Sequence, residues 1–334
     1  GVQKAQVGRL ANGEWAAIFG SGHGASSGHL FVVNLETGDL IKKLDAGNAG
    51  LSTPVFTVDD GIVEYVYAGN MDGGLWRFDL TADKAKQWGA TKLFQTEGPE
   101  GDPQPITSAP VIADMPRTKG ERVISFGTGS FFRTGDDADT SVQSLYGIID
   151  EQGSSSNIQR KDLLVQEIVK DSDIEDVDVE QGDGSTEEKD FTVRQVSQNK
   201  LSDSDQGWVL DLDTEAGERV VSQAGFPSGL DRSRVRFSTL IPDTDICSSG
   251  TDGFLMEISL ITGGRVNEPV LDLDRDGKGD HADQSGIKGV LGGEGITRMR
   301  DEDGDTIIDE DGGPGARFTV PEGALGRRNW EQLK

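Results

Sequence analysis

The stretch Val66–Asp83 reads VYAGNMDGGLWRFDLTAD and joins two short apolar runs through a glycine-rich turn. Valine, tyrosine, tryptophan and phenylalanine favour strands, and glycine permits the backbone angles of a tight reversal. The stretch therefore predicts two antiparallel strands. Its two halves, VYAGNMDG and LWRFDLTAD, each have counterparts elsewhere in the chain.

A strand followed by a turn recurs five times along the chain. The five segments are Leu30–Leu40 (LFVVNLETGDL), Leu75–Asp83 (LWRFDLTAD), Leu145–Gly153 (LYGIIDEQG), Trp208–Val220 (WVLDLDTEAGERV) and Phe254–Val266 (FLMEISLITGGRV). The shorter intervals between them match the roughly 40–50 residues of a β-propeller blade. A single unit of this size cannot bury its own apolar face, so neighbouring units must stack.

These repeats predict an all-β fold, a modified, quinoprotein-like β-propeller that is incomplete in this chain. We expect one domain over residues 1–334, with two departures from the repeat. Residues 154–206 form an acidic insertion between blades, and residues 268–315 form an Asp-rich excursion. Ser52–Val55 and Ser108–Val111 each have the pattern of the start of an inner strand. A β-sandwich is the structural alternative.

The composition argues against several classes of binding partner and against a membrane-spanning helix. The 334 residues carry a formal net charge of −27, which argues against binding to nucleic-acid phosphates or to anionic lipid. No run approaches the ~18 apolar residues of a membrane helix, so we expect no membrane insertion. Cys247 is the only cysteine, which excludes an internal disulfide. The chain opens at Gly1 with neither Met nor signal peptide, and we interpret it as a fragment or a processed chain.

An acidic loop over residues 272–283 has the spacing of a calcium site. Ca²⁺ prefers oxygen ligands, and a twelve-residue loop supplies them from positions 1, 3, 5, 7, 9 and 12, with glycine at position 6. Gly277 occupies that glycine position, and Lys278 would contribute its backbone carbonyl. The predicted ligands are Asp272, Asp274, Asp276, Lys278, Asp280 and Asp283. Because position 12 is Asp instead of Glu, we expect a structural site, not a sensor.

A second acidic stretch fits the same spacing less completely. Its candidate ligands are Asp301, Asp303, Asp305 and Asp309, but Gly312 falls at position 12. Two further clusters, Asp59-Asp60-Gly61 and Asp136-Asp137-Ala138-Asp139, are interpreted as turns.

The residues that could carry catalysis form no recognisable motif. The three histidines are His23, His29 and His281, and no pair has the spacing of a zinc helix. No nucleophile elbow is visible either. Aromatic residues fall on predicted strands or their edges, where core packing explains them better than ligand stacking: Trp15, Trp76, Phe78, Phe131, Phe132 and Trp208. We expect a protein that is not an enzyme.

Several stretches, in order along the chain, resemble the PilY/PilC family of type IV pilus tip-associated adhesins. The signature is Tyr67–Leu80 (YAGNMDGGLWRFDL). It is accompanied by Asn12–Gly20 (NGEWAAIFG), Pro105–Pro110 (PITSAP), Phe126–Gly129 (FGTG), Gly207–Leu212 (GWVLDL), Ser238–Pro242 (STLIP) and Gly326–Leu333 (GRRNWEQL).

The resemblance implies the C-terminal propeller of an exported, pilus-associated protein on the outer surface of a Gram-negative bacterium. It implies roles in pilus assembly, adhesion and twitching motility, with Ca²⁺ as regulator. The implied partners are pilus subunits or minor pilins and a host-surface receptor. Only the later blades would be present in this chain. Family members often carry a calcium loop before the YAGN-type strand, but here Val58–Glu64 lacks the spaced acids.

Two other functions remain open at this point. Leu35–Leu40 (LETGDL) resembles the blade motif of quinone-dependent dehydrogenases, although Ile41–Leu44 replaces the tryptophan that usually follows it. A general extracellular, calcium-stabilised scaffold is the third possibility.

Overall fold

The computed structural model describes residues 4–115, 118, 120–151, 156–180, 185–227, 233–242, 251–267, 270–273, 284–291, 298–300, 304–308 and 314–319. In these residues the regular elements are β-strands and two 3₁₀ turns, η1 (Ala85–Gln87) and η2 (Arg160–Asp162). None of the helices described is long and apolar enough to cross a bilayer. The all-β expectation is confirmed.

Two four-stranded meanders open the fold. The first sheet contains β1 (Gln6–Arg9), β2 (Trp15–Gly20), β3 (His29–Asn34) and β4 (Leu40–Asp45), and the second contains β5 (Val55–Asp59), β6 (Ile62–Gly69), β7 (Gly74–Asp79) and β8 (Gly89–Gln95). In each, consecutive strands pair antiparallel, as expected for a propeller blade. A single parallel bridge between Arg9 and Ile62 joins the two meanders into one eight-stranded hydrogen-bonded sheet, and the two meanders are called the first and second sheets below.

The next two sheets take strands from distant parts of the chain. The third sheet has the order β12 (Leu164–Gln166), β15 (Gly207–Leu212), β11 (Gln143–Glu151), β10 (Glu121–Gly127), β9 (Val111–Asp114). The fourth has the order β13 (Ile168–Glu180), β14 (Thr186–Val196), β19 (Gly286–Leu291), β17 (Thr251–Ser259), β16 (Arg234–Ser238). A fifth, smaller sheet orders β18 (Leu271–Asp272), β22 (Pro314–Thr319), β21 (Gly304–Ile308) and β20 (Arg298–Arg300).

The repeats map onto the sheets with one correction. Segments Leu145–Gly153 and Trp208–Val220 do not belong to two blades, because β11 and β15 pair antiparallel in the same third sheet. The inner strands expected to start near Val55 and Val111 do start there, as β5 and β9.

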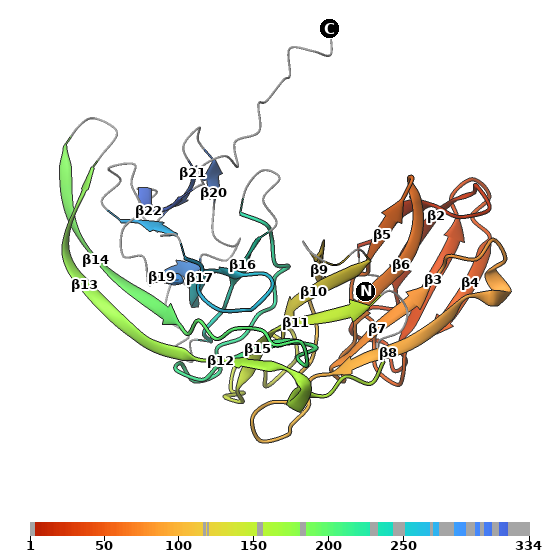
Figure 1. The fold of residues 1–334 in the computed structure, drawn as a ribbon, viewed down its shortest axis with the longest axis horizontal. Helices are drawn as coiled ribbons and strands as arrows, with labels where there is room; N and C mark the ends of the chain where they lie inside the picture. Colours follow the sequence, from red (N-terminus) through yellow and green to blue (C-terminus); the bar gives the residue numbers. More distant parts are fainter. Residues whose placement is uncertain are drawn as a thin grey trace, which may run out of the picture.

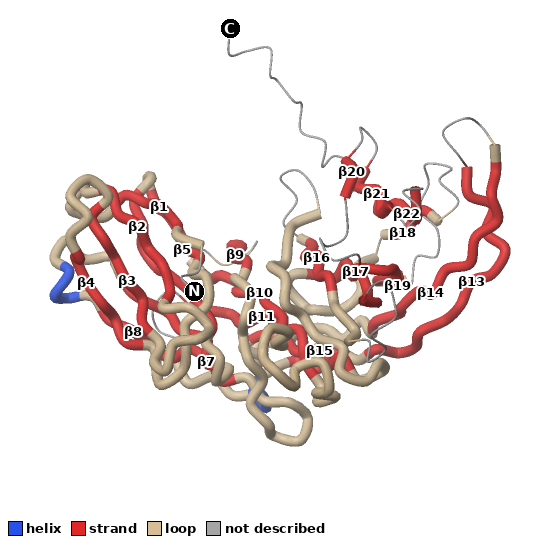
Figure 2. The backbone as a smooth tube through the Cα atoms, turned by 180° about the vertical axis from the view of Figure 1, so that it is seen from behind, coloured by secondary structure: helices blue, strands red, loops and turns tan. Residues whose placement is uncertain are grey.

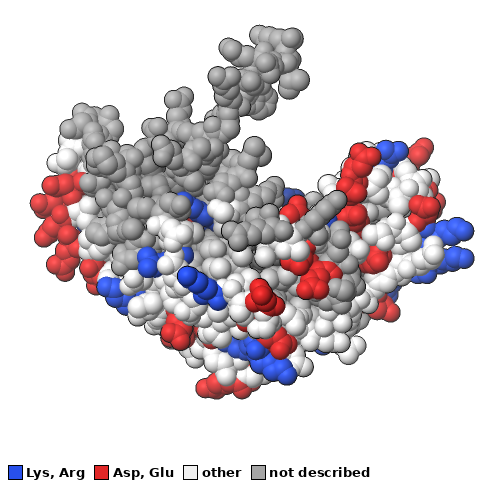
Figure 3. Space-filling model, viewed as in Figure 1, with Lys and Arg blue, Asp and Glu red and all other residues white. Residues whose placement is uncertain are grey.

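The acidic segment 154–206 contributes strands to the third and fourth sheets. Its residues include β12 of the third sheet and β13 and β14 of the fourth. The β13–β14 hairpin is the long curved ribbon at one end of the molecule (Figure 1), and acidic side chains gather over it (Figure 3). Its apolar side chains, Val179 and Phe191 among them, form a cluster with Leu271 and Leu273.

The core lies between successive sheets, which follow one another along a curved row (Figures 1 and 2). Ile18 and Phe78 belong to the cluster between the first and second sheets, and Phe94 and Tyr146 to that between the second and third. Between the third and fourth sheets, Trp208 and Phe254 share a cluster. Each inner face comes from the alternation of strand residues, in which every second side chain points to the same side.

Candidate metal loops and binding pocket

Most of the predicted ligands of the main calcium loop lie outside the described residues. Asp272 is the last residue of β18, where the structure gives the backbone alone, while Asp274, Asp276, Lys278, Asp280 and Asp283 are not described. In the second stretch, Asp305 lies in β21, again as backbone only, and Asp301, Asp303 and Asp309 are not described. Both calcium sites therefore stay predictions.

Both flanks of the main loop are anchored in the fold. Val270, Leu271 and Leu273 precede or open the loop, and each has at most 1% of its surface exposed. On the other side, the Ser285 N–H donates to the Arg194 carbonyl at 2.7 Å, and the Ser285 carbonyl accepts from the Glu257 N–H at 2.7 Å. The chain thus enters and leaves residues 274–283 from fixed positions near β14 and β17.

The position at which family members often carry a calcium loop is a tight hairpin turn here. β5 ends at Asp59, β6 begins at Ile62, and these two residues pair with each other. Asp60 and Gly61 form the connection, with φ of 47° and 75°. Two successive left-handed residues are typical of a type I′ turn. As the sequence predicted, Asp59-Asp60-Gly61 is a turn.

The acids at residues 136–139 also belong to a turn. The Asp136 carboxylate accepts hydrogen bonds from the Ser130 hydroxyl at 2.6 Å and from the N–H groups of Phe132 and Arg133 at 2.9 and 2.8 Å. Burial opposes ionisation of Asp136, but these hydrogen bonds outweigh it and lower its pKa. In the described part of the chain, no group of three or more His, Cys, Asp or Glu residues lies close enough to hold a metal ion.

Sequence reasoning missed a set of buried arginines that join loops and sheets. Arg219, 1% exposed, donates to the carbonyls of Gly217, Ser130, Asp136 and Asp139, and so fixes the loop between β10 and β11. Arg77 on β7 pairs with Asp150 on β11 at 2.5 Å.

Arg234 and Arg236 both pair with Glu257. They alternate with the core residues Val235 and Phe237, a pattern that normally marks solvent-facing positions, so no pattern along the chain indicates that these arginines are buried.

Two of the three histidines, His23 and His29, lie in the described residues and contact neighbouring side chains, while His281 lies outside them. The His23 ring stacks on Phe132, with centroids 4.7 Å apart, and burial lowers its pKa. His29 lies between Ser27, whose Oγ is 2.9 Å from Nε2, and Asp45, whose Oδ1 is 2.9 Å from Nδ1. This order resembles a Ser–His–carboxylate triad. The Asp45 side chain, however, is 86% exposed, and its approach to Nδ1 lacks hydrogen-bond geometry, so the imidazole is not held as in a working triad.

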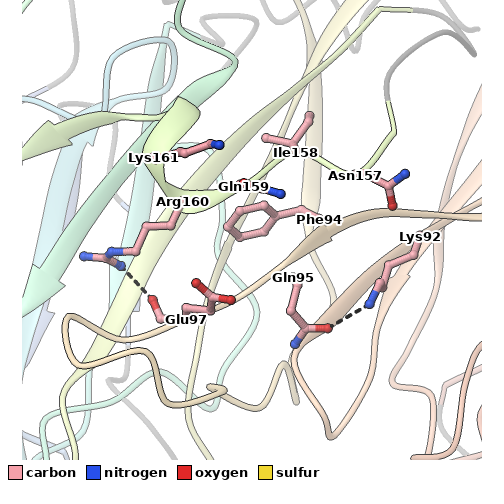
Figure 4. A pocket seen from close by; sticks show the side chains of 9 residues that line it. All are labelled: Lys92, Phe94, Gln95, Glu97, Asn157, Ile158, Gln159, Arg160 and Lys161. Atoms are coloured by element: carbon pink, nitrogen blue, oxygen red, sulfur yellow. Dashed lines mark hydrogen bonds between the residues drawn. The ribbon is translucent and has the colours of Figure 1, made fainter.

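A cavity of about 400 Å³ lies between β8 and the segment that leads into η2 (Figure 4). It is lined by Lys92, Phe94, Gln95, Glu97, Asn157, Ile158, Gln159, Arg160 and Lys161. Arg160 donates to the Glu97 carbonyl at 2.8 Å and pairs with Asp211 at 2.5 Å. The Lys92 ammonium contacts the Gln95 amide oxygen at 3.3 Å. Arg160 and Lys92, two of the cations that line the cavity, are therefore bonded to groups of the protein itself.

Comparisons with known proteins agree with the architecture. A family model described as the PilY1 beta-propeller domain matches residues 1–173. The "Type IV pilus biogenesis factor PilY1" of Pseudomonas aeruginosa strain PAO1 is 31% identical over 389 residues, covering 99% of this chain and 32% of that protein. A "Type IV pilus biogenesis factor PilY1 homolog" of Xylella fastidiosa is 32% identical over 296 residues, covering 78% of this chain and 19% of that protein.

A solved structure shares the fold over almost the whole chain. The crystal structure of the Pseudomonas aeruginosa PilY1 C-terminal domain matches with a TM-score of 0.76 and 26% identity, covering 96% of this chain and 72% of that one. The chain spans about a third of the length of the PAO1 relative. The ordered sheets, the family match and the shared fold together place this chain in the PilY1 family, within its C-terminal β-propeller domain.

Proposed function

We propose that this chain acts in type IV pilus biogenesis as a non-enzymatic, calcium-binding propeller. The observation that carries the proposal is the likeness to a PilY1 pilus biogenesis factor over 99% of the chain, supported by the shared fold. The proposal extends to adhesion and twitching motility. We also propose that it acts outside the cell or on the outer membrane, associated with the pilus. Pilus subunits or minor pilins are its proposed partners, together with a host-surface receptor.

The calcium part of the proposal rests on loop spacing and on the anchored flanks. Leu271 and Leu273 are buried against the β13–β14 hairpin, and Ser285 bonds to β14 and β17. An ion held by carboxylates between these flanks would offset the repulsion among the loop's acids. Its role would be to hold the loop's two ends together, as a structural ion does.

Calcium titration by calorimetry tests this role. Wild type is expected to release heat on binding, and Asp274→Ala/Asp276→Ala is expected to lose that heat. Asp59→Ala/Asp60→Ala is the matched control, because it removes two acids from a hairpin turn outside the loop. Equal heats from wild type and Asp274→Ala/Asp276→Ala would refute calcium binding by this loop.

Gene deletion tests the biogenesis role separately. In the piliated source bacterium, deletion is expected to reduce surface pili, and the wild-type gene is expected to restore them. Normal piliation after deletion would contradict the proposal whatever the calorimetry shows. Complementation with Asp274→Ala/Asp276→Ala then measures how far piliation depends on the loop.

A further inference from the structure

The cavity of about 400 Å³ beside β8 has walls that come from two sheets (Figure 4). One wall is β8 of the second sheet, and the other leads through η2 into β12 of the third. The Ile158 N–H donates to the Leu93 carbonyl at 3.0 Å, and Ile158 also forms a parallel bridge with Phe94. Because these backbone contacts join the two walls, the shape of the cavity is set by the fold itself.

Polar side chains make up most of the lining of this cavity. Seven of the nine lining residues are polar or charged, and the two apolar ones, Phe94 and Ile158, are 0% and 3% exposed. These two side chains therefore offer little apolar surface to an occupant. Peptides and apolar small molecules are usually held by apolar anchors in buried pockets. This cavity is instead suited to an occupant that is recognised through hydrogen bonds and charge.

The charge of the lining is opposite to that of the whole chain. The lining holds three cations, Lys92, Arg160 and Lys161, and one anion, Glu97. Their formal charge is +2, from three positive groups and one negative group, whereas the 334 residues together carry −27. Arg160 is paired with Asp211, and Lys92 contacts a neutral amide oxygen. Among the described residues, the Lys161 ammonium has neither a hydrogen bond nor an ion pair, so it is available to an anion.

Asn157 adds a hydrogen-bonding side chain on a backbone of uncommon conformation. Its φ is 54°, in the left-handed region that asparagine tolerates better than most residues. Its N–H donates to the Lys92 carbonyl at 3.4 Å, while its side-chain amide has no hydrogen bond to a described residue. Figure 4 shows Lys92 and Asn157 at one end of the cavity and Arg160 and Lys161 at the other. The free amide and the free ammonium thus lie apart, as two contact points for one ligand.

We propose that this cavity binds an acidic sugar, a ring of hydroxyl groups that carries a carboxylate or a phosphate. Lys161 would bind the anionic group through a charge-assisted hydrogen bond, and Lys92 would add to the attraction. Sugar hydroxyls need both donors and acceptors, which the Asn157 amide and the Glu97 carboxylate provide. The volume lies within the roughly 300–1,000 Å³ of small-molecule sites. The inference does not depend on calcium binding or on a role in piliation.

Four small ligands test which chemistry the cavity recognises. The dissociation constants of D-glucuronate, D-glucose 6-phosphate, D-glucose and acetate are measured by NMR titration at low salt. D-Glucose has the hydroxyls without the charge, and acetate has the charge without the hydroxyls. We expect at least one of the two acidic sugars to bind about tenfold more tightly than either control, as a hydrogen bond to a charged group allows. The tighter of the two identifies the anionic group.

Variants of the lining assign the binding to this cavity. Lys161→Gln removes the free charge and is expected to weaken binding of the acidic sugar about tenfold. Asn157→Gly removes the amide but keeps the left-handed backbone, which glycine adopts freely, and is expected to weaken binding about fivefold. Lys43→Gln is the matched control, because Lys43 is an exposed lysine on β4 of the first sheet. Lys161 and Asn157 are exposed as well, so thermal unfolding should stay unchanged in all three variants.

Three outcomes would overturn the proposal. If neither acidic sugar binds more tightly than both D-glucose and acetate, the cavity does not recognise the combination of charge and hydroxyls. Wild-type affinity in both Lys161→Gln and Asn157→Gly would place the binding elsewhere on the molecule. Tighter binding of a polyglutamate peptide than of either acidic sugar would identify an acidic protein segment as the occupant.

Discussion

Arg194 and Glu218 form an ion pair in which neither side chain is exposed, with Nη1 2.7 Å from Oε1. Arg194 lies on β14 of the fourth sheet, and Glu218 follows β15 of the third, so the pair joins two sheets. The same guanidinium contacts Asp171 at 2.9 Å and lies 3.5 Å from the centroid of Phe254. Burial opposes the charge, but hydrogen bonds to Asp171 and the charge of Glu218 outweigh it and raise the Arg194 pKa.

Breaking this pair is expected to destabilise the fold strongly. Glu218→Ala leaves a buried guanidinium with less compensation, a type of change that costs about 3–5 kcal/mol. Denaturant unfolding of wild type and variant measures the difference. Glu36→Ala is the control, because that glutamate lies exposed in a turn and is expected to change little. A loss at Glu218 no larger than at Glu36 would contradict the assigned importance of the pair.

Trp208 is expected to stabilise the junction of the third and fourth sheets by both volume and hydrogen bonding. Trp208→Phe leaves the Leu260 carbonyl without its indole donor and should cost about 1–3 kcal/mol. Trp208→Ala also opens a cavity and should cost about 3–5 kcal/mol. The same denaturant assay compares both with Trp15→Phe in residues 1–334, which is expected to be nearly neutral because Trp15 is 55% exposed. Similar losses at the two tryptophans would argue against the prediction.

Arg219 is expected to control the loop between β10 and β11. Lysine cannot reproduce the fork through which the guanidinium reaches four carbonyls, so Arg219→Lys should loosen residues 130–139. Hydrogen exchange in this loop should accelerate, while exchange in β6 and β7 stays unchanged. Unaltered protection of the loop would show that its own turn contacts, including those of Asp136, suffice.

The raised pKa values of the three tyrosines predict that the folded protein loses stability at alkaline pH. Burial raises the pKa of Tyr146 to about 12, and Tyr65 and Tyr67 are also raised, mainly by burial. Because the unfolded chain ionises first, at the ordinary pKa of 10, the stabilisation is complete below pH 10. For Tyr146 it is lost as the pH rises from about 10 to about 12. Unfolding free energy measured against pH should fall across this window.

Tyr146→Phe separates the contribution of one tyrosine. The Tyr146 hydroxyl donates to the Glu97 carbonyl or the Gln104 amide oxygen, each at 2.7 Å, and accepts from Arg160 at 3.1 Å. Removing it should lower stability at neutral pH and reduce the slope of the alkaline decline. A slope identical to that of wild type would mean that Tyr146 does not ionise in the window assigned to it.

Local strand and turn signals in the sequence were enough to find most elements. The run LFVVN predicts the strand β3, and the following ETG predicts the turn after it. Both predictions succeed because strand and turn formation here depend on residues that are neighbours along the chain. The assignment of strands to particular sheets was harder to predict from the sequence. Leu145 and Trp208 were assigned to separate repeats, yet Leu145 pairs with Leu210 on the same strand as Trp208, a contact that no local pattern encodes.

For the candidate calcium site, the sequence predicts only what the spacing of the acidic residues indicates. The acids of residues 272–283 suggested a loop, but the anchoring of its flanks by Leu273 and Ser285 depends on tertiary packing. Burial of Arg194 and Arg219 was equally hidden, because a lone arginine on a strand or in a turn is normally exposed. Core packing is the expectation for Trp15 from its place on a strand, but its side chain is 55% exposed. Position on a strand alone does not say which face of the sheet is buried.

The strand order of the third sheet also determines when that sheet can be completed while the chain is being synthesised. β11 ends at Glu151, but its partner β15 begins only at Gly207. An emerging chain therefore holds an incomplete third sheet until the intervening residues have been made. Such late, non-local closure slows folding, since the entropy of the long loop is lost before the contacts form. The first two sheets, with consecutive strands, can assemble while the rest of the chain is still unstructured.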